Sequence, residues 1–167
     1  GKTGFPATSA AGDVSLDKKN LRMSFCHRDG KRILDGEIRR FENGLPVRVH
    51  FELTKEPEDS MVIATPFPEK KTAFYYNQKI IGMRASGKAE YAGRVYEFRE
   101  EDSFALLDWG RGVWTYDNTW YWSAAMGPCG GETFGFNLGY GFGDTSAATE
   151  NMLFYKGKAH KLEDVRF

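Results

Sequence analysis

Residues 134–143 read FGFNLGYGFG, and this stretch decides which fold classes are open to the chain. Bulky residues take every second position and alternate with glycine or asparagine, which is the period-two pattern of a β-strand. The bulky positions are Phe134, Phe136, Leu138, Tyr140 and Phe142, and the small ones are Gly135, Asn137, Gly139, Gly141 and Gly143. The pattern predicts a strand with one bulky face and one nearly bare face.

The bare face needs a physical reason, because glycine weakens a strand. Each interior glycine costs roughly 0.5–1 kcal/mol relative to alanine, so the four glycines cost about 2–4 kcal/mol together. A sharp bend, a neighbouring side chain or a bound ligand can offset this cost. The structural interpretation is that a tryptophan from the next strand covers the glycines. The functional interpretation is that they leave room for a ligand, and both can hold together.

Turn signals elsewhere extend the β pattern along the chain. Six residue pairs separate strand-like runs: Asp29-Gly30, Asn43-Gly44, Ala92-Gly93, Asp117-Asn118, Gly130-Gly131 and Lys156-Gly157. We expect strands at 21–26, 45–53, 61–65, 73–81, 89–91, 94–98 and 152–156, and an aromatic hairpin in which WTY meets TWYW across Asp117-Asn118. Short helices are expected only near 102–107 and 144–150. The sequence therefore predicts an all-β antiparallel meander, closed as a barrel or packed as a sandwich.

Composition limits the domain count and the partners. The length of 167 residues suits one domain, and we expect a single β-domain at 14–167. The segment 1–13 is rich in small residues and is expected to be a loose lead-in. Lys plus Arg and Asp plus Glu both total 23, so no global field attracts nucleic acid or an anionic membrane. No apolar run is long enough for an integral membrane segment. The two cysteines favour a reduced compartment, and we expect a cytoplasmic location.

No cofactor or metal is expected from the motifs. The three histidines, His27, His50 and His160, are scattered, and neither cysteine has a second at a metal-ligand spacing. His50 lies on the polar side of its predicted strand and is expected to be solvated. The glycines at 139, 141 and 143 lack the spacing of a nucleotide-binding loop.

The stretch FALLDWGRGVWTYDNTWYW at 104–122 holds the candidate catalytic residues, Asp108 and Arg111. A carboxylate among aromatic residues must be paired or protonated. One interpretation is that a bend is fixed by an Asp108–Arg111 pair or by Asp108 capping nearby backbone amides. The other is a protonated Asp108 that faces an apolar cavity and donates a proton to a ligand. A second polar cluster, Asp144, Glu150 and Asn151, is explained either by turn chemistry or by a site.

The candidate ligand-binding residues combine these aromatic, glycine and polar positions. They are Trp109, Trp114, Tyr116, Trp120, Trp122, Asn137, Gly139, Gly141, Asp144, Glu150 and Asn151.

Long runs of the sequence resemble one family. The runs MVIATPF (61–67), KKTAFYYNQKI (70–80), LLDWGRGVWTYDNTWYW (106–122) and GFNLGYGFGDTSAATENMLFYKGKAHKL (135–162) are similar to the bacterial and fungal family catalogued as domain of unknown function twenty-eight-oh-four. The resemblance extends from about Gly12 to Phe167. Members of that family have no established activity and are longer at both ends. The resemblance implies a middle portion of such a chain, whose sheet is incomplete and whose partners include the missing N- and C-terminal parts.

A more distant resemblance concerns the lipocalin-like superfamily that contains hydroxyneurosporene synthase, a carotenoid hydratase. The shared features are an E-Y-x-G-x-x-Y element at Glu90–Tyr96 and an aspartate before a W-G pair, here Asp108 before Trp109 and Gly110. This resemblance implies a calycin-type barrel or a strongly coiled sheet. It also implies Asp108 as a general acid and Trp109 as part of a cavity wall.

Three functions remain open from the sequence. The first is a lipocalin-like module that binds a lipid or terpenoid in an aromatic-lined cavity. The second is a hydratase or isomerase that acts on an unsaturated isoprenoid or lipid, with Asp108 as the acid and Arg111 or Tyr116 tuning its charge state. The third is a structural or interaction domain whose aromatic strip meets a partner.

Overall fold

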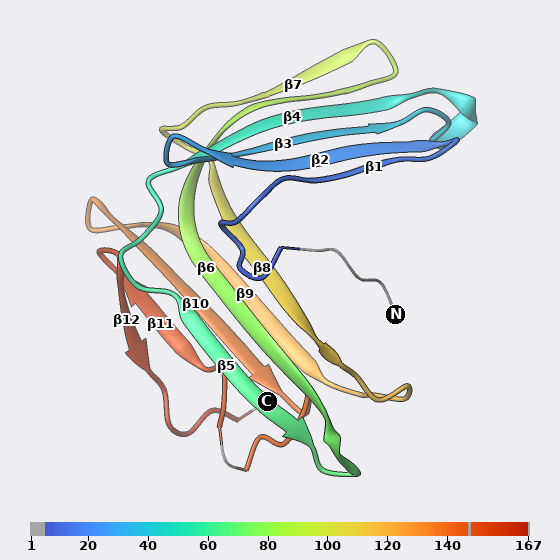
Figure 1. The fold of residues 1–167 in the computed structure, drawn as a ribbon. Helices are drawn as coiled ribbons and strands as arrows, with labels where there is room; N and C mark the ends of the chain where they lie inside the picture. The colour runs from blue at the N-terminus through green and yellow to red at the C-terminus, as the bar shows by residue number, and fades with distance from the viewer. Residues whose placement is uncertain (1–5, 147, 167) are drawn as a thin grey trace. The chain divides into compact units, whose positions relative to one another are not determined.

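The computed structural model describes residues 6–146 and 148–166, and strands dominate it (Figure 1). The strands are β1 Val14–Asp17, β2 Leu21–Arg28, β3 Lys31–Ile38, β4 Val47–Thr54, β5 Met61–Phe67, β6 Lys70–Tyr91, β7 Arg94–Phe98, β8 Phe104–Val113, β9 Tyr121–Cys129, β10 Glu132–Tyr140, β11 Met152–Tyr155 and β12 Lys158–Lys161. A short 3-10 turn occupies Glu42–Gly44. The all-β antiparallel class predicted from the sequence is confirmed. None of the described residues forms a helix long and apolar enough to cross a membrane.

The strands form two hydrogen-bonded sheets. The eight-stranded sheet has the order β1-β2-β3-β4-β6-β5, and β7 and β8 also pair with β6. The four-stranded sheet has the order β12-β11-β10-β9. Five of the six predicted turn pairs have positive φ at both residues, for example Ala92 at 50° and Gly93 at 75°. Asn43-Gly44 lies in the 3-10 turn. Each of the other four pairs connects two consecutive strands that are hydrogen-bonded to each other. This geometry is that of a type I′ hairpin turn, as the sequence predicted.

Three local predictions are wrong: one aromatic hairpin and two short helices. The aromatic hairpin at 114–122 does not form, because β8 ends at Val113 and β9 begins only at Tyr121, in the other sheet. The Asn118 side chain instead donates a hydrogen bond to the Thr115 backbone oxygen and closes a loop. The expected helix at 102–107 is replaced mostly by the start of β8. The described residues near 144–150 are not helical, and Asp144 accepts hydrogen bonds from Ser146 in a turn.

The chain divides into two compact units, each built from two segments. Unit 1 contains the described residues up to Lys55 together with Arg84–Phe104, and unit 2 contains Glu56–Met83 and Ala105 onwards. The long strand β6 contributes its first part to unit 2 and its last part to unit 1. The predicted lead-in at 1–13 lies partly outside the described residues, and its described part, 6–13, contains no strand.

Unit 1 is an antiparallel sheet of β1, β2, β3, β4, the end of β6, and β7. Its register places charges of alternating sign side by side across five strands. This row runs through Asp17, Arg22, Glu37, Arg48 and Glu90. Such cross-strand pairs of opposite charge stabilise a sheet and keep its polar face solvated.

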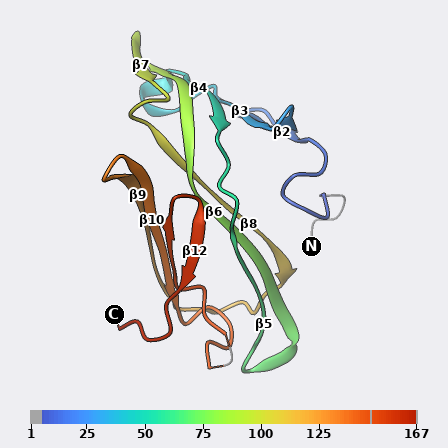
Figure 2. The same cartoon turned by 90° about the vertical axis from the view of Figure 1, so that its left-hand side faces the viewer.

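Unit 2 consists of two sheets, which lie next to each other in Figure 2. The two sheets share one hydrophobic core. One sheet contains β5, the first part of β6 and β8, and the other contains β9 to β12. The core comes from both: Met61, Ile63, Phe67, Ala73, Tyr75 and Ile81 from β5 and β6, and Phe154 from β11. The alternating burial of β5, with every second residue buried, fits this arrangement.

The bare face of β10 points into this core. Gly135, Asn137 and Gly139 are buried, whereas Tyr140 on the opposite face is 56% exposed. A Cβ atom built at Gly135 would lie 2.6 Å from Ile81 Cγ2, and one at Gly139 would lie 2.5 Å from Glu150 Cδ. Trp122 is the residue opposite Gly139 across the ladder, as a covering tryptophan would be. The nearest atoms at Gly139, however, belong to Glu150, so the glycine makes room for a carboxylate.

Candidate functional site

Lys79 lies at the centre of a buried polar network in unit 2. Alternation along β6 turns Tyr75, Asn77, Lys79 and Ile81 towards one face, and the Lys79 side chain is only 4% exposed there. Its Nζ atom is 2.9 Å from Asp108 Oδ2 and 3.4 Å from Glu150 Oε2. It also lies 4.6 Å from the centroid of a Trp122 ring, a cation–π distance. One ammonium therefore joins β6, β8, β9 and the segment before β11.

Asn137 and Asn151 complete the network by fixing the Glu150 segment. The Asn137 amide nitrogen donates to the Glu150 backbone oxygen at 2.9 Å and to Glu150 Oε2 at 3.2 Å. The indole nitrogen of Trp122 donates to Asn137 Oδ1 at 2.8 Å. The backbone nitrogen of Gly139 donates to Asn151 Oδ1 at 2.8 Å. We call Lys79, Asp108, Trp122, Asn137, Glu150 and Asn151 the Lys79 site.

The electrostatics of the Lys79 site follow from its burial. Removing an ammonium or a carboxylate from water costs several kcal/mol, which close pairing and additional hydrogen bonds offset. The neighbouring Tyr75 phenol responds to the same environment. Burial, followed by the Glu150 charge, raises the pKa of Tyr75 well above its ordinary value of 10.0, so the phenol stays protonated.

An aromatic cluster centred on Phe142 adjoins this network. The Phe142 ring lies 4.9 Å from Tyr75, 5.2 Å from Trp120, 5.3 Å from Phe67 and 5.5 Å from Trp114, between ring centroids. We call these five residues the Phe142 cluster. Trp114 and Trp120 are 57% and 52% exposed, although both contact a ring that packs on the core. The cluster thus extends from the core to the surface.

The structure brings eight of the thirteen residues predicted for the site together in two groups. Asp108, Trp122, Asn137, Gly139, Glu150 and Asn151 meet around Lys79, and Trp114 and Trp120 meet in the Phe142 cluster. The ion-pair partner of Asp108 is Lys79, which the sequence interpretation did not consider. The role of Asp108 as a proton donor stays a prediction.

The remaining five predicted residues make other contacts or lie at the surface. Trp109 contacts Tyr76, which precedes Asn77 and faces the other side of β6, with ring centroids 5.8 Å apart. Tyr116 is fully exposed. Arg111 is exposed near the C-terminal end of β8. A Cβ atom at Gly141 would lie 2.9 Å from the Thr119 backbone oxygen, so no space is free beside this glycine. Asp144 forms a turn with Ser146, whose hydrogen bonds hold the pKa of that carboxyl below its usual value.

Lys79 is the functional candidate that sequence reasoning missed. A signal was available in the run Ala73, Tyr75, Asn77, Lys79, Ile81, where two polar residues interrupt an otherwise apolar face. A lysine on such a face needs a carboxylate partner. The partners, Asp108 and Glu150, come from segments distant in sequence, so the pair itself could not be read from local pattern.

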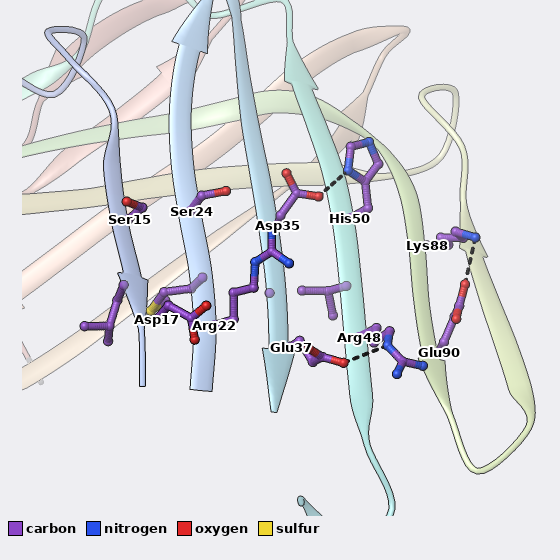
Figure 3. A pocket seen from close by; sticks show the side chains of 14 residues that line it. Ser15, Asp17, Arg22, Ser24, Asp35, Glu37, Arg48, His50, Lys88 and Glu90 are labelled. Carbon is purple, nitrogen blue, oxygen red and sulfur yellow. Dashed lines mark hydrogen bonds and ion pairs between the residues drawn. The ribbon is translucent and has the colours of Figure 1, made fainter. Parts of the chain in front are cut away.

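A second feature is an open groove of about 750 Å³ on the polar face of unit 1 (Figure 3). Six of its polar side chains form three pairs: Arg48 Nε with Glu37 Oε1 at 2.9 Å, His50 Nδ1 with Asp35 Oδ1 at 2.7 Å, and Lys88 Nζ with Glu90 Oε1 at 2.7 Å. These exposed pairs suit a solvated sheet face. Within the described residues, no three His, Cys, Asp or Glu side chains are grouped to hold a metal ion.

The fold and the Lys79 site define an antiparallel all-β protein with a charged network between two sheets of one unit, in which Lys79 and Glu150 are buried and Asp108 is partly exposed. The chain belongs to the family described as Domain of unknown function (DUF2804), whose model matches residues 1–167. The family resemblance seen in the sequence is thereby confirmed. The comparisons with curated proteins and with solved structures gave no significant match. The relationship to the lipocalin-like superfamily stays a prediction.

Proposed function

We propose that the protein is a binding module for a small apolar molecule, such as a lipid or a terpenoid, held against Trp114, Trp120 and Trp122. The observation that carries this proposal is the exposure of these three tryptophans, between 41% and 57%, beside a buried polar network. Burial of apolar surface away from water contributes roughly 25 cal/mol per Å² of favourable free energy, which exposed rings do not gain. An apolar ligand on these rings would recover part of that free energy.

The strand pairing supports access to these rings. In the described part of the chain, β8 pairs with β6 and β9 pairs with β10, and no ladder joins β8 to β9. Asp108 lies on β8, Trp122 lies on β9, and Trp114 and Trp120 lie in the connection between the two strands. A ligand that enters between these edges breaks no backbone hydrogen bond.

The Lys79 site supplies the polar side of the proposed binding region. Sites for apolar ligands combine aromatic walls with a few fixed polar groups. The Asp108 side chain is 42% exposed, whereas its partner Lys79 is buried, so Asp108 is the accessible member of the pair. The same pair supports binding over acid catalysis, because Asp108 Oδ2 is already engaged with the Lys79 ammonium 2.9 Å away.

A fluorescent fatty-acid probe tests the proposal. The purified full chain is titrated with the probe, and organic extracts of the protein are analysed by mass spectrometry for co-purified lipids. Trp120→Ala is expected to weaken probe binding about tenfold, since a packed aromatic contact is worth more than about 1 kcal/mol. The matched control is Tyr96→Ala in unit 1, an aromatic side chain of similar exposure, 49%, which should leave the affinity unchanged.

Two results would overturn the proposal. One is an unmodified protein that binds no probe and yields empty extracts in repeated preparations. The other is an equal loss of affinity in Trp120→Ala and Tyr96→Ala, which would place the probe elsewhere.

A further inference from the structure

The bulky residues of β10 lie on the side of its sheet that is turned away from the core. Figure 2 shows the four-stranded sheet on one side of unit 2 and β5, β6 and β8 on the other. Ala124, Met126 and Phe154 pack inwards on the core, so the residues next to them in each strand point outwards. We call these outward positions of β9, β10 and β11 the outer face: Tyr121, Ser123, Ala125, Gly127, Cys129, Glu132, Phe134, Phe136, Leu138, Tyr140, Leu153 and Tyr155. None of these side chains is buried, and Tyr121, Tyr140 and Tyr155 are 59%, 56% and 38% exposed.

The outer face has a ridge along β10 and a trough along β9. In three successive rows, a large side chain of β10 lies directly opposite a small residue of β9: Leu138 opposite Ser123, Phe136 opposite Ala125, and Phe134 opposite Gly127. A Cβ atom added at Gly127 would have no atom within 4 Å, so the trough is open there. The ridge and the trough lie about 5 Å apart, the spacing of neighbouring strands.

The composition of the outer face is that of an interface core. Glu132, at one end of β10, is the only charged residue on this side of β9, β10 and β11, and its carboxylate pairs with Lys156 at 3.4 Å. The cores of protein interfaces are depleted of charged residues and enriched in aromatic ones. The polar face of unit 1 shows the alternative, because ion pairs cover it. A contiguous apolar patch of this kind marks an interaction site.

The relief of the outer face is complementary to itself. A twofold axis that runs parallel to the strands, midway between β9 and β10, places β10 of each copy over β9 of the other. With the two sheets about 10 Å apart, Phe136 of one copy lies over Ala125 of the other, and the neighbouring rows match in the same way. A twofold axis perpendicular to the strands would instead place ridge on ridge.

The size of the outer face sets the strength of such a contact. β9 and β10 have nine residues each. At about 3.3 Å per residue and about 4.8 Å per strand they cover about 300 Å² in plan. Side chains stand out of this plane and β11 flanks it, so two copies bury on the order of 1,000 Å² in total, the lower limit for a specific interface. Such a contact is reversible, with a dissociation constant in the micromolar range.

We propose that the outer face is the interface of a reversible homodimer, in which the β10 ridge of each copy packs into the β9 trough of the other. This inference goes beyond the proposed binding of an apolar molecule and does not rest on it. The dimer would bury the apolar face that β10 turns away from its own core.

Sedimentation velocity of the full chain tests the dimer over about 1 to about 200 µM, a range that spans micromolar dissociation constants. The unmodified protein should shift from the mass of one chain to that of two. Ala125→Arg should raise the dissociation constant at least about a hundredfold, because the new charge would be buried in the trough without a partner. Ala64→Arg is the matched control, an exposed alanine of β5 outside the outer face, and should dimerise like the unmodified protein.

Three results would overturn this inference. An unmodified protein that stays monomeric over the whole range would leave the outer face to a different partner. A dimer that persists in Ala125→Arg would use another surface. Equal weakening by Ala125→Arg and Ala64→Arg would be an effect of added charge alone. The measurement on the unmodified protein does not depend on the folding of any variant, and fatty-acid probe binding is scored separately, so the dimer and the proposed function can fail independently.

Discussion

At the scale of single residues, one ammonium group lies between two carboxylates at Lys79. Asp108 Oδ2 and Glu150 Oε2 approach the same nitrogen from different segments, and only Asp108 is substantially exposed. Breaking a buried pair by removing one partner destabilises a protein because the other charge stays behind without compensation. The network thus depends more on Lys79 than on either carboxylate alone.

Replacement of Lys79 by methionine tests this dependence. Lys79→Met keeps a similar side-chain length but leaves Glu150 buried without its cation, so the free energy of unfolding should fall by about 3 kcal/mol. Lys71→Met is the control, since Lys71 is 71% exposed and forms only a 3.5 Å pair with Asp144. Its cost should be within about 0.5 kcal/mol of zero. Urea unfolding of both variants measures the difference, and equal costs would contradict the central role of Lys79.

Tyr75 gives a pH-dependent prediction at the same scale. Burial and the Glu150 charge raise the pKa of Tyr75 above 10.0, whereas the unfolded chain ionises the phenol at the ordinary value. The resulting contribution to stability is complete below about pH 10 and is lost as the pH rises further. The free energy of unfolding should therefore decrease as the pH rises above about 10 in the unmodified protein. In Tyr75→Phe the decrease should be smaller, and identical slopes for the two proteins would show that Tyr75 does not contribute.

At the scale of the element, β10 shows why a strand can have a bare face inside a core. Its glycines face side chains that arrive from other segments, Ile81 at Gly135 and Glu150 at Gly139. The bulky residues of the same strand lie on the opposite face, where Tyr140 is largely exposed. The cost of glycine in this strand is offset by the room it leaves for the Glu150 carboxylate and its partners.

A methyl group at Gly139 should remove that room. The Cβ atom of Gly139→Ala would lie 2.5 Å from Glu150 Cδ, so Glu150 must move away from Lys79 and Asn137. We expect a loss of about 2–4 kcal/mol, from overpacking and broken polar contacts. Gly127→Ala on the neighbouring strand β9 is the control, because no atom lies within 4 Å of its added Cβ. Thermal unfolding compares the two, and similar melting temperatures would refute this account of Gly139.

The elements also show how far local sequence pattern reaches. Strands and hairpin turns were predictable because alternation and pairs such as Asp29-Gly30 act over a few neighbouring residues. The pair Asp117-Asn118 led to a wrong prediction of a hairpin. The Asn118 side chain donates a hydrogen bond to the Thr115 backbone oxygen, and the chain passes here from one sheet to the other. Asp108 was recognised as a carboxylate that needs a partner, but Arg111 was the only cation nearby in sequence. Its partner, Lys79, is joined to it only by the pairing of β6 with β8.

At the scale of the whole chain, the two units differ in how much apolar surface they bury. Among the described residues, nine of the ten buried hydrophobic side chains belong to unit 2, and the tenth, Ala85, belongs to unit 1. Unit 1 relies instead on backbone ladders and on exposed cross-strand ion pairs, which contribute little each. Unit 1 should therefore open locally more easily than unit 2.

Native-state hydrogen exchange followed by mass spectrometry measures this difference, and β6 supplies its own control. Its segment at 75–83 lies in unit 2 and its segment at 86–91 lies in unit 1, while both are hydrogen-bonded to neighbouring strands. Amides of the first segment, with those of β10 and β11, should exchange at least about tenfold more slowly than amides of the second segment, β1 and β2. Backbone pairing is similar in the two halves, so a difference reports on the core beneath them. Uniform protection along β6 would mean that the two units open as one cooperative structure, and unit 1 would then need a source of stability beyond its ladders and ion pairs.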